Sequence, residues 1–111
     1  QAPTLLVQSS KFDDSSDGDH VGRVVIPGPK MEVLTILEML GDMGIQALLV
    51  EGGVETWKIF LDSDLVDRVR TCTSSVTLGS GGKKFDTDMT GYGMSKVSEE
   101  EVDGDTVCWW E

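Results

Sequence analysis

One carboxylate and two adjacent glycines follow a short apolar run in this chain. The run, Ala47–Val50, is continuous and of strand length, which predicts a strand buried on both faces. Glu51 and the pair Gly52-Gly53 come next, and then an amphipathic segment, Val54–Leu61. Such a junction can present backbone N–H groups and the positive end of a helix to an anion. The sequence therefore predicts a site for a phosphate-bearing ligand.

Glu51 follows apolar residues directly, so burying it without a partner would be costly. Either it reaches a rim that is exposed to ligand, or it accepts hydrogen bonds from neighbouring backbone N–H groups. The carboxyl end of a strand is the usual place for ligand contacts in an open α/β sheet. The residues alone leave both interpretations open.

A second glycine-rich segment, Gly79–Gly82, precedes Lys83 and Lys84 and could also cradle a phosphate. It lacks the spacing of a Walker motif, so a flexible turn is the alternative. No metal site is expected. Asp13–Gly18 begins like a calcium loop, but Val24 stands where that loop needs a bidentate carboxylate. The only histidine has no second histidine or cysteine nearby.

Composition and charge exclude several classes of partner. The chain has 111 residues and a net charge of -11, which argues against nucleic acid and against anionic membrane surfaces. No stretch approaches the roughly 18 apolar residues of a membrane span. A dinucleotide phosphate would need local cations, and the candidates are Arg23, Lys58, Lys83 and Lys84, each of which has a solvated surface charge as its alternative interpretation.

The elements that would position these residues form an α/β pattern. Periodicity and turn residues predict strands at Thr4–Gln8, Val24–Ile26, Ala47–Val50 and Leu65 to about Leu78, helices at Met31–Met43 and Val54–Leu61, and a C-terminal β-hairpin of Met94–Glu101 and Thr106–Glu111. Because helices link successive strands, the expected fold class is α/β, a mainly parallel sheet flanked by helices.

Three segments carry a resemblance to a known family. Leu48–Gly53 and its flanks resemble the C-terminal reductase domain of riboflavin-biosynthesis proteins, the 5-amino-6-(5-phosphoribosylamino)uracil reductases, which have a dihydrofolate-reductase-like fold. Pro3–Val7 looks like the family's central strand. Ile36–Gly53 looks like its helix, turn and glycine-terminated strand. Leu65 to Gly82 looks like a later strand and glycine-rich loop, although Arg68 stands where an acidic residue is usual.

The resemblance implies one domain, residues 1–111, similar to the C-terminal portion of such a reductase domain. It implies that Glu51 contacts substrate, and that the cofactor NADPH is bound by Gly53, Val54, Glu55, Thr56 and Trp57. No residue is assigned a catalytic role. The family's opening strand, which carries a substrate-binding Ser-Leu-Asp-Gly segment, has no counterpart in the sequence.

Two functions are therefore expected from the sequence. The first is an NADPH-dependent reductase that acts on a small-molecule phosphoribosylamino-pyrimidine and forms a homo-oligomer or part of a larger complex. The second is a non-catalytic half-domain that serves as a structural or interaction subunit. Cys72 and Cys108 are expected to be buried free thiols, which favours a reducing compartment, the cytoplasm or the plastid stroma.

Overall fold

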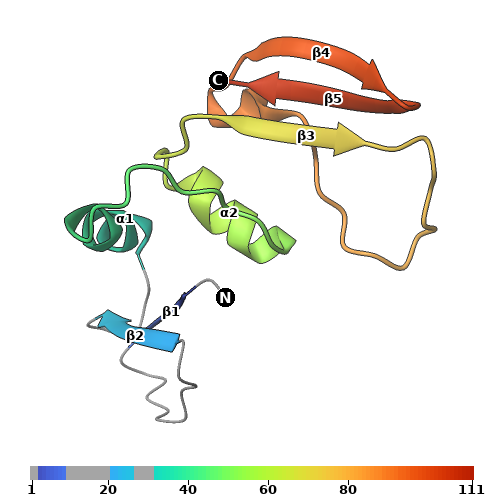
Figure 1. The fold of residues 1–111 in the computed structure, drawn as a ribbon. Coiled ribbons are helices and arrows are strands. Elements are labelled where there is room, and N and C mark those ends of the chain that lie inside the picture. Colours follow the sequence, from blue (N-terminus) through green and yellow to red (C-terminus); the bar gives the residue numbers. More distant parts are fainter. Residues whose placement is uncertain (1–2, 10–20, 27–31) are drawn as a thin grey trace. The chain divides into compact units, whose positions relative to one another are not determined.

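The computed structural model describes residues 3–9, 21–26 and 32–111 (Figure 1). The chain divides into two compact units, Gln1–Leu49 and Val50–Glu111, which we describe in turn. Within the described residues the fold is α/β, with two α-helices and two separate sheets.

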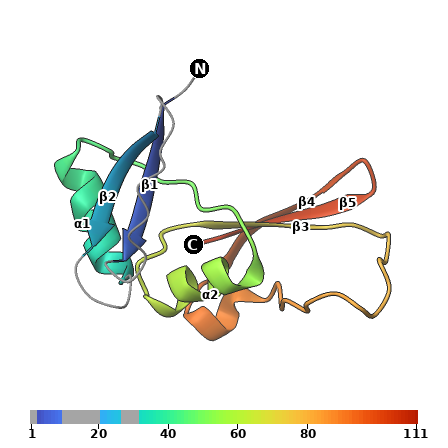
Figure 2. The same cartoon turned by 90° about the horizontal axis from the view of Figure 1, so that it is seen from below.

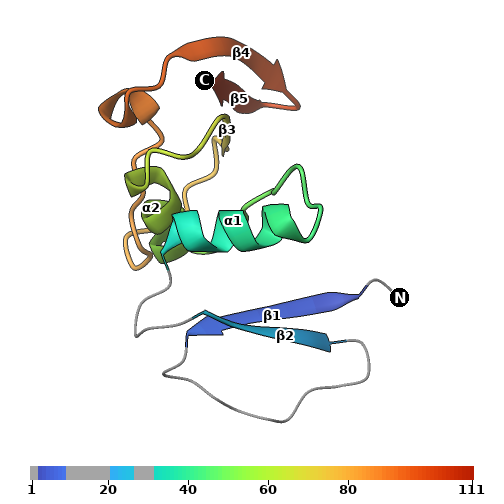
Figure 3. The ribbon, with the colours of Figure 1, turned by 90° about the vertical axis from the view of Figure 1, so that its left-hand side faces the viewer.

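The first unit contains a pair of parallel strands. Strand β1, Thr4–Ser9, pairs with β2, Val21–Ile26, in a register that runs from Thr4 opposite Val21 to Ser9 opposite Ile26. Figure 3 shows these strands side by side. The strand predicted at Thr4–Gln8 is thus confirmed, and the one predicted at Val24–Ile26 begins three residues earlier. Asp13–Gly18, where no calcium site is expected, lies outside the described residues.

Helix α1, Val33–Asp42, confirms the helix predicted at Met31–Met43. Its apolar face buries Val33 and Leu40. The helix ends where Gly44 adopts a φ of +88°, and the Gly44 N–H donates to the Gly41 carbonyl at 2.9 Å. This left-handed position after the helix is one that glycine occupies at low cost.

The strand predicted at Ala47–Val50 is wrong. Residues 45–51 form neither helix nor strand, and 81% of Leu49 is exposed. A strand needs a neighbour for its N–H and C=O groups, and no described strand pairs with this run. The predicted mainly parallel sheet is also wrong. Among the described strands only β1 and β2 are a parallel pair, and the other pairs are antiparallel.

The second unit is built on an antiparallel sheet of three strands. They are β3, Val69–Thr73, β4, Lys96–Val102, and β5, Asp105–Trp110. The order is β3-β5-β4, so β5 lies in the middle (Figure 1). Figure 2 shows β4 and β5 as the two arms of one hairpin. Strand β3 is shorter than the expected strand from Leu65 to about Leu78. The predicted C-terminal hairpin is confirmed, and its turn residues Asp103 and Gly104 have φ values of +52° and +87°.

Two helical segments cover part of this unit's core. Helix α2, Val54–Asp62, confirms the helix predicted at Val54–Leu61, and the short helix η1 spans Met89–Tyr92. The core cluster contains Leu61, Met89, Met94, Cys108 and Trp110, and the Met89 side chain is fully buried. Apolar residues of α2, η1 and β5 therefore meet in one core.

The two C-terminal tryptophans lie on opposite faces of β5. Trp110 is buried, and its indole N–H donates to the Thr71 hydroxyl at 3.2 Å. Trp109 is half-buried, with the guanidinium groups of Arg68 and Arg70 each 5.9 Å from its ring centre. The cysteine prediction is half correct, since both thiols are free but Cys72 is exposed.

Candidate functional site

The Gly-Gly junction has a backbone that only glycine adopts easily. Gly52 has a φ of +133°, whereas Gly53 has an ordinary extended backbone with φ -70° and ψ 174°. The specialised backbone geometry of the pair therefore belongs to Gly52. The turn at Gly52 delivers the chain directly into α2, whose N-cap is Gly53.

The amino end of α2 carries no side-chain cap. No side chain at the N-cap accepts a hydrogen bond from the first turn, and a Cβ atom built on Gly53 would meet nothing within 4 Å. The first-turn N–H groups of a helix lack partners within the helix and form the positive end of its dipole. The junction therefore offers donors and open space to an anion.

Lys83, which directly follows the glycine-rich segment Gly79–Gly82, reaches this helix end. The Lys83 ammonium lies 3.0 Å from a Glu55 carboxylate oxygen in the first turn of α2. Both side chains are largely exposed, at 71% and 76%. The hydrogen bond and charge of Lys83, with a smaller contribution from Lys58, hold the pKa of Glu55 below its usual value.

A ring contact gives α2 and this segment a second connection. The Trp57 and Phe85 rings lie 5.3 Å apart and are tilted by 56°. Trp57 is 38% exposed, so it lies at the edge of the core and not at its centre. The structure thus brings Glu55 and Trp57 against the segment that follows Gly79–Gly82. Sequence separation concealed this, because the ion pair joins residues 28 positions apart.

Three other predicted residues flank the junction, whereas Arg23 does not. Glu51 is exposed and follows an irregular segment instead of a strand, so its carboxylate is accessible to a ligand. Val54 is half-buried, and Thr56 is exposed with its hydroxyl oxygen 3.8 Å from the position of a Cβ on Gly52. Arg23 belongs to the other unit.

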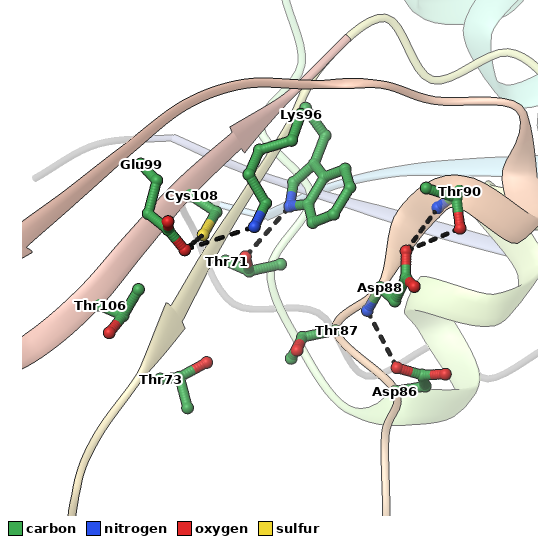
Figure 4. Close-up of a pocket in the computed structure, with 11 residues that line it drawn as sticks. Thr71, Thr73, Asp86, Thr87, Asp88, Thr90, Lys96, Glu99, Thr106 and Cys108 are labelled. Carbon is green, nitrogen blue, oxygen red and sulfur yellow. Dashed lines mark hydrogen bonds and ion pairs between the residues drawn. The ribbon is translucent and has the colours of Figure 1, made fainter.

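A second concave region lies on the sheet, and sequence reasoning missed it. It encloses about 560 Å³ between the strands and the segment before η1 (Figure 4). Its lining is polar: Thr71, Thr73, Asp86, Thr87, Asp88, Thr90, Lys96, Glu99, Thr106, Cys108 and Trp110. Alternating threonines in β3 were the only sequence signal.

The polar groups of this pocket already bind one another. The Lys96 ammonium lies 3.3 Å from Glu99, and the Cys108 thiol donates to the same carboxylate at 3.5 Å. The Lys96 hydrogen bond holds the pKa of Glu99 below its usual value, and burial raises the pKa of Cys108. Asp88 accepts from the Thr90 N–H at 3.0 Å, which lowers its pKa. Within the described residues no group of three His, Cys, Asp or Glu could hold a metal ion.

The fold and the junction define an α/β protein in which a Gly-Gly turn leads into an uncapped helix. The chain belongs to the family of the RibD C-terminal domain, whose model matches residues 1–107. It is 28% identical over 102 residues to a 2,5-diamino-6-ribosylamino-4(3H)-pyrimidinone 5′-phosphate reductase of Methanothermobacter thermautotrophicus. The match covers 89% of this chain and 46% of that relative.

The chain thus spans about half the length of the curated relative that it matches. In the part of the chain that the structure describes, no helix has both the length and the apolar character needed to cross a membrane.

Proposed function

We propose that this chain contributes the cofactor-binding part of an NADPH-dependent reductase of riboflavin biosynthesis, acting on a phosphoribosylamino-pyrimidine. The observation that carries the proposal is the junction at Gly52 and Gly53, which opens into an uncapped helix end reached by the Lys83 ammonium. Family membership and the relative's activity support the same conclusion.

The residues at the junction fit the phosphates of a dinucleotide. The first-turn N–H groups of Val54, Glu55 and Thr56 would donate to phosphate oxygens, and the space beside Gly53 admits them. Trp57, one turn further along α2, is partly exposed and would contact the nucleotide. When bound, NADPH supplies the hydride, and the protein supplies orientation and charge.

Glu51 would hold the substrate. An ionised carboxylate only accepts hydrogen bonds, so it pairs with the amino and ring N–H groups of a pyrimidine. Two substrates fit this description: 5-amino-6-(5-phosphoribosylamino)uracil, expected from the family resemblance, and the 2,5-diamino-pyrimidinone phosphate named for the relative. They differ at ring position 2, where the second carries an amino donor. We propose the uracil as substrate and treat the pyrimidinone as the competing outcome.

The test is NADPH oxidation by the full-length protein that contains this chain, with each pyrimidine in turn. Glu51→Gln is expected to raise the substrate KM and leave NADPH affinity unchanged, whereas Gly53→Val is expected to weaken NADPH because its side chain fills the open space. A higher kcat/KM for the pyrimidinone would overturn the uracil assignment. If both variants match the active wild type, the site assignment is wrong.

A second candidate function is that of a non-catalytic subunit. Exposed apolar side chains favour it, because Leu49 and Leu78 are 81% and 99% exposed and a partner could cover them. Calorimetry on the 111-residue chain tests whether it holds only half of a binding site. We expect it to bind NADPH weakly or not at all, since half a site returns too few contacts to offset the cost of binding. Nanomolar affinity would contradict this half-site interpretation.

A further inference from the structure

Glu55 lies at a place in the fold that favours negative charge. It is the only acidic residue in the first turn of α2, at the positive end of the helix dipole. Its carboxylate already has a cationic partner, the Lys83 ammonium at 3.0 Å. The protein's own side chain therefore makes two interactions that a ligand phosphate would also make, one with the helix dipole and one with lysine.

The ion pair between these residues is of the kind that exchanges easily. Both side chains are mostly in solvent, and exposed pairs contribute little because water screens them and long side chains lose entropy. The two linked phosphates of a dinucleotide together carry more charge and more acceptor oxygens than one carboxylate, so they are the stronger partner for an ammonium. An arriving phosphate would thus separate Lys83 from Glu55.

We propose that Glu55 is an internal competitor for the nucleotide phosphate and that Lys83 moves from Glu55 to the phosphate when the nucleotide binds. Both are then specificity-determining residues: Lys83 favours a phosphorylated ligand, and Glu55 sets how strong an anion must be to displace it. The inference rests on the proposed function, because the same helix end is assigned to NADPH.

The contact between Trp57 and Phe85 limits how far Lys83 has to move in this exchange. Trp57 comes two residues after Glu55, and Phe85 comes two residues after Lys83. The ring contact therefore joins α2 to the segment of Lys83 close to the ion pair. When the ion pair opens, the ring contact still holds the lysine backbone beside the helix end. Lys83 therefore needs only a change of side-chain rotamer to reach a phosphate there.

The first experiment measures NADPH affinity in the full-length protein by calorimetry. Glu55→Gln should bind about two- to fivefold more tightly, as expected for removing one charge at a helix end. Asp62→Asn, the matched control, removes the same charge at the other end of α2 and should leave affinity unchanged. Lys83→Gln should bind about fivefold more weakly. In the Lys83→Gln background the gain from Glu55→Gln should shrink, because no lysine remains to be released. An undiminished gain would refute the exchange.

The second experiment follows the ionisation of Glu55 by NMR, with inorganic pyrophosphate as the probe. Two cations act on this carboxylate, Lys83 from the glycine-rich segment and Lys58 on α2, and the pKa starts below its usual value. Saturating pyrophosphate should raise the pKa, because Lys83 leaves and a negative charge arrives. Lys83→Gln should raise it without any anion. Pyrophosphate that binds and leaves the pKa of Glu55 unchanged, or that does not bind at all, would overturn the exchange.

The two experiments separate failure of this inference from failure of the proposed function. If the wild type oxidises NADPH with a pyrimidine and Glu55→Gln binds no more tightly, the exchange is wrong and the reductase assignment stands. If the wild type neither binds NADPH nor reduces either pyrimidine, the reductase assignment is wrong. The pyrophosphate titration then still decides whether Lys83 changes partner.

Discussion

Gly52→Ala should destabilise the chain, whereas Gly53→Ala should have little effect. The two glycines are adjacent and undergo the same chemical change, so they form a matched pair. They differ in backbone conformation, since Gly52 has a φ of +133° and Gly53 a φ of -70°. Only the first lies in the region that residues with a Cβ rarely adopt.

The magnitude follows from the surroundings of each residue. A Cβ on Gly52 would lie 3.8 Å from the Thr56 hydroxyl oxygen and 3.9 Å from the Thr56 Cβ, which are ordinary contacts. The cost is therefore conformational, about 1–3 kcal/mol, less the roughly 0.4–1 kcal/mol that alanine returns by restricting the unfolded chain. The net loss for Gly52→Ala is about 1–2 kcal/mol.

For Gly53→Ala the opposing effects cancel. Its extended backbone suits any residue, and a Cβ there meets no atom within 4 Å. Alanine is a poorer N-cap than glycine, which offsets the gain from the unfolded state, so stability should change by less than about 0.5 kcal/mol.

Urea unfolding followed by circular dichroism measures the difference. With an m-value of about 2 kcal/mol/M, the Gly52→Ala midpoint should fall by roughly 0.5–1 M below that of Gly53→Ala. Equal midpoints would refute the reasoning, because they would mean that the positive φ of Gly52 carries no strain for alanine. A larger loss for Gly53→Ala would refute it as well.

Three further predictions concern the second unit, which contains the three-stranded sheet. Met89→Ala should cost about 3 kcal/mol by urea unfolding, since it empties a fully buried site, and a loss under 1 kcal/mol would contradict that burial. Native-state alkylation should modify the exposed Cys72 much faster than Cys108, whose burial also raises its pKa; equal rates would contradict the assigned positions. Asp88 has a lowered pKa, so its ionised form stabilises the fold above the usual aspartate pKa, and this contribution disappears as the pH falls through the lower folded-state value. The difference in urea midpoint between wild type and Asp88→Asn should therefore be present at neutral pH and shrink below about pH 4, and a difference that persists in acid would exclude the charge as its cause.

Local patterns predicted the helices and the hairpin well. Helix periodicity depends on residues three and four apart, and it placed α1 and α2 to within about two residues. The Asp103-Gly104 turn is likewise determined by two residues that tolerate a positive φ. In each case the information lies within one or two turns of chain.

Strand pairing could not be predicted in the same way. Ala47–Val50 has the composition of a buried strand, but composition does not specify the neighbour that must accept its hydrogen bonds, and the structure leaves Leu49 exposed. The family resemblance located the ligand-facing residues along the chain. It could not locate the partner of Glu55, because the position of Lys83 depends on how the segment after β3 returns to α2.

The polar pocket was missed for a related reason. Its two walls come from different parts of the chain, the sheet residues Thr71 and Glu99 on one side and Asp86 on the other. No short motif contains all of them. A sequence motif reveals a site when the functional groups lie close together in the chain, and this pocket is assembled by the fold.

The central position of β5 has a consequence for how the protein is made. Strands β3 and β4 share no hydrogen bonds, and each pairs only with β5, which is synthesised after both. Until β5 has formed, neither β3 nor β4 has a partner within this sheet. A chain that ends at the hairpin turn therefore leaves two unpaired strands after release, and such strands are open to association with other polypeptides.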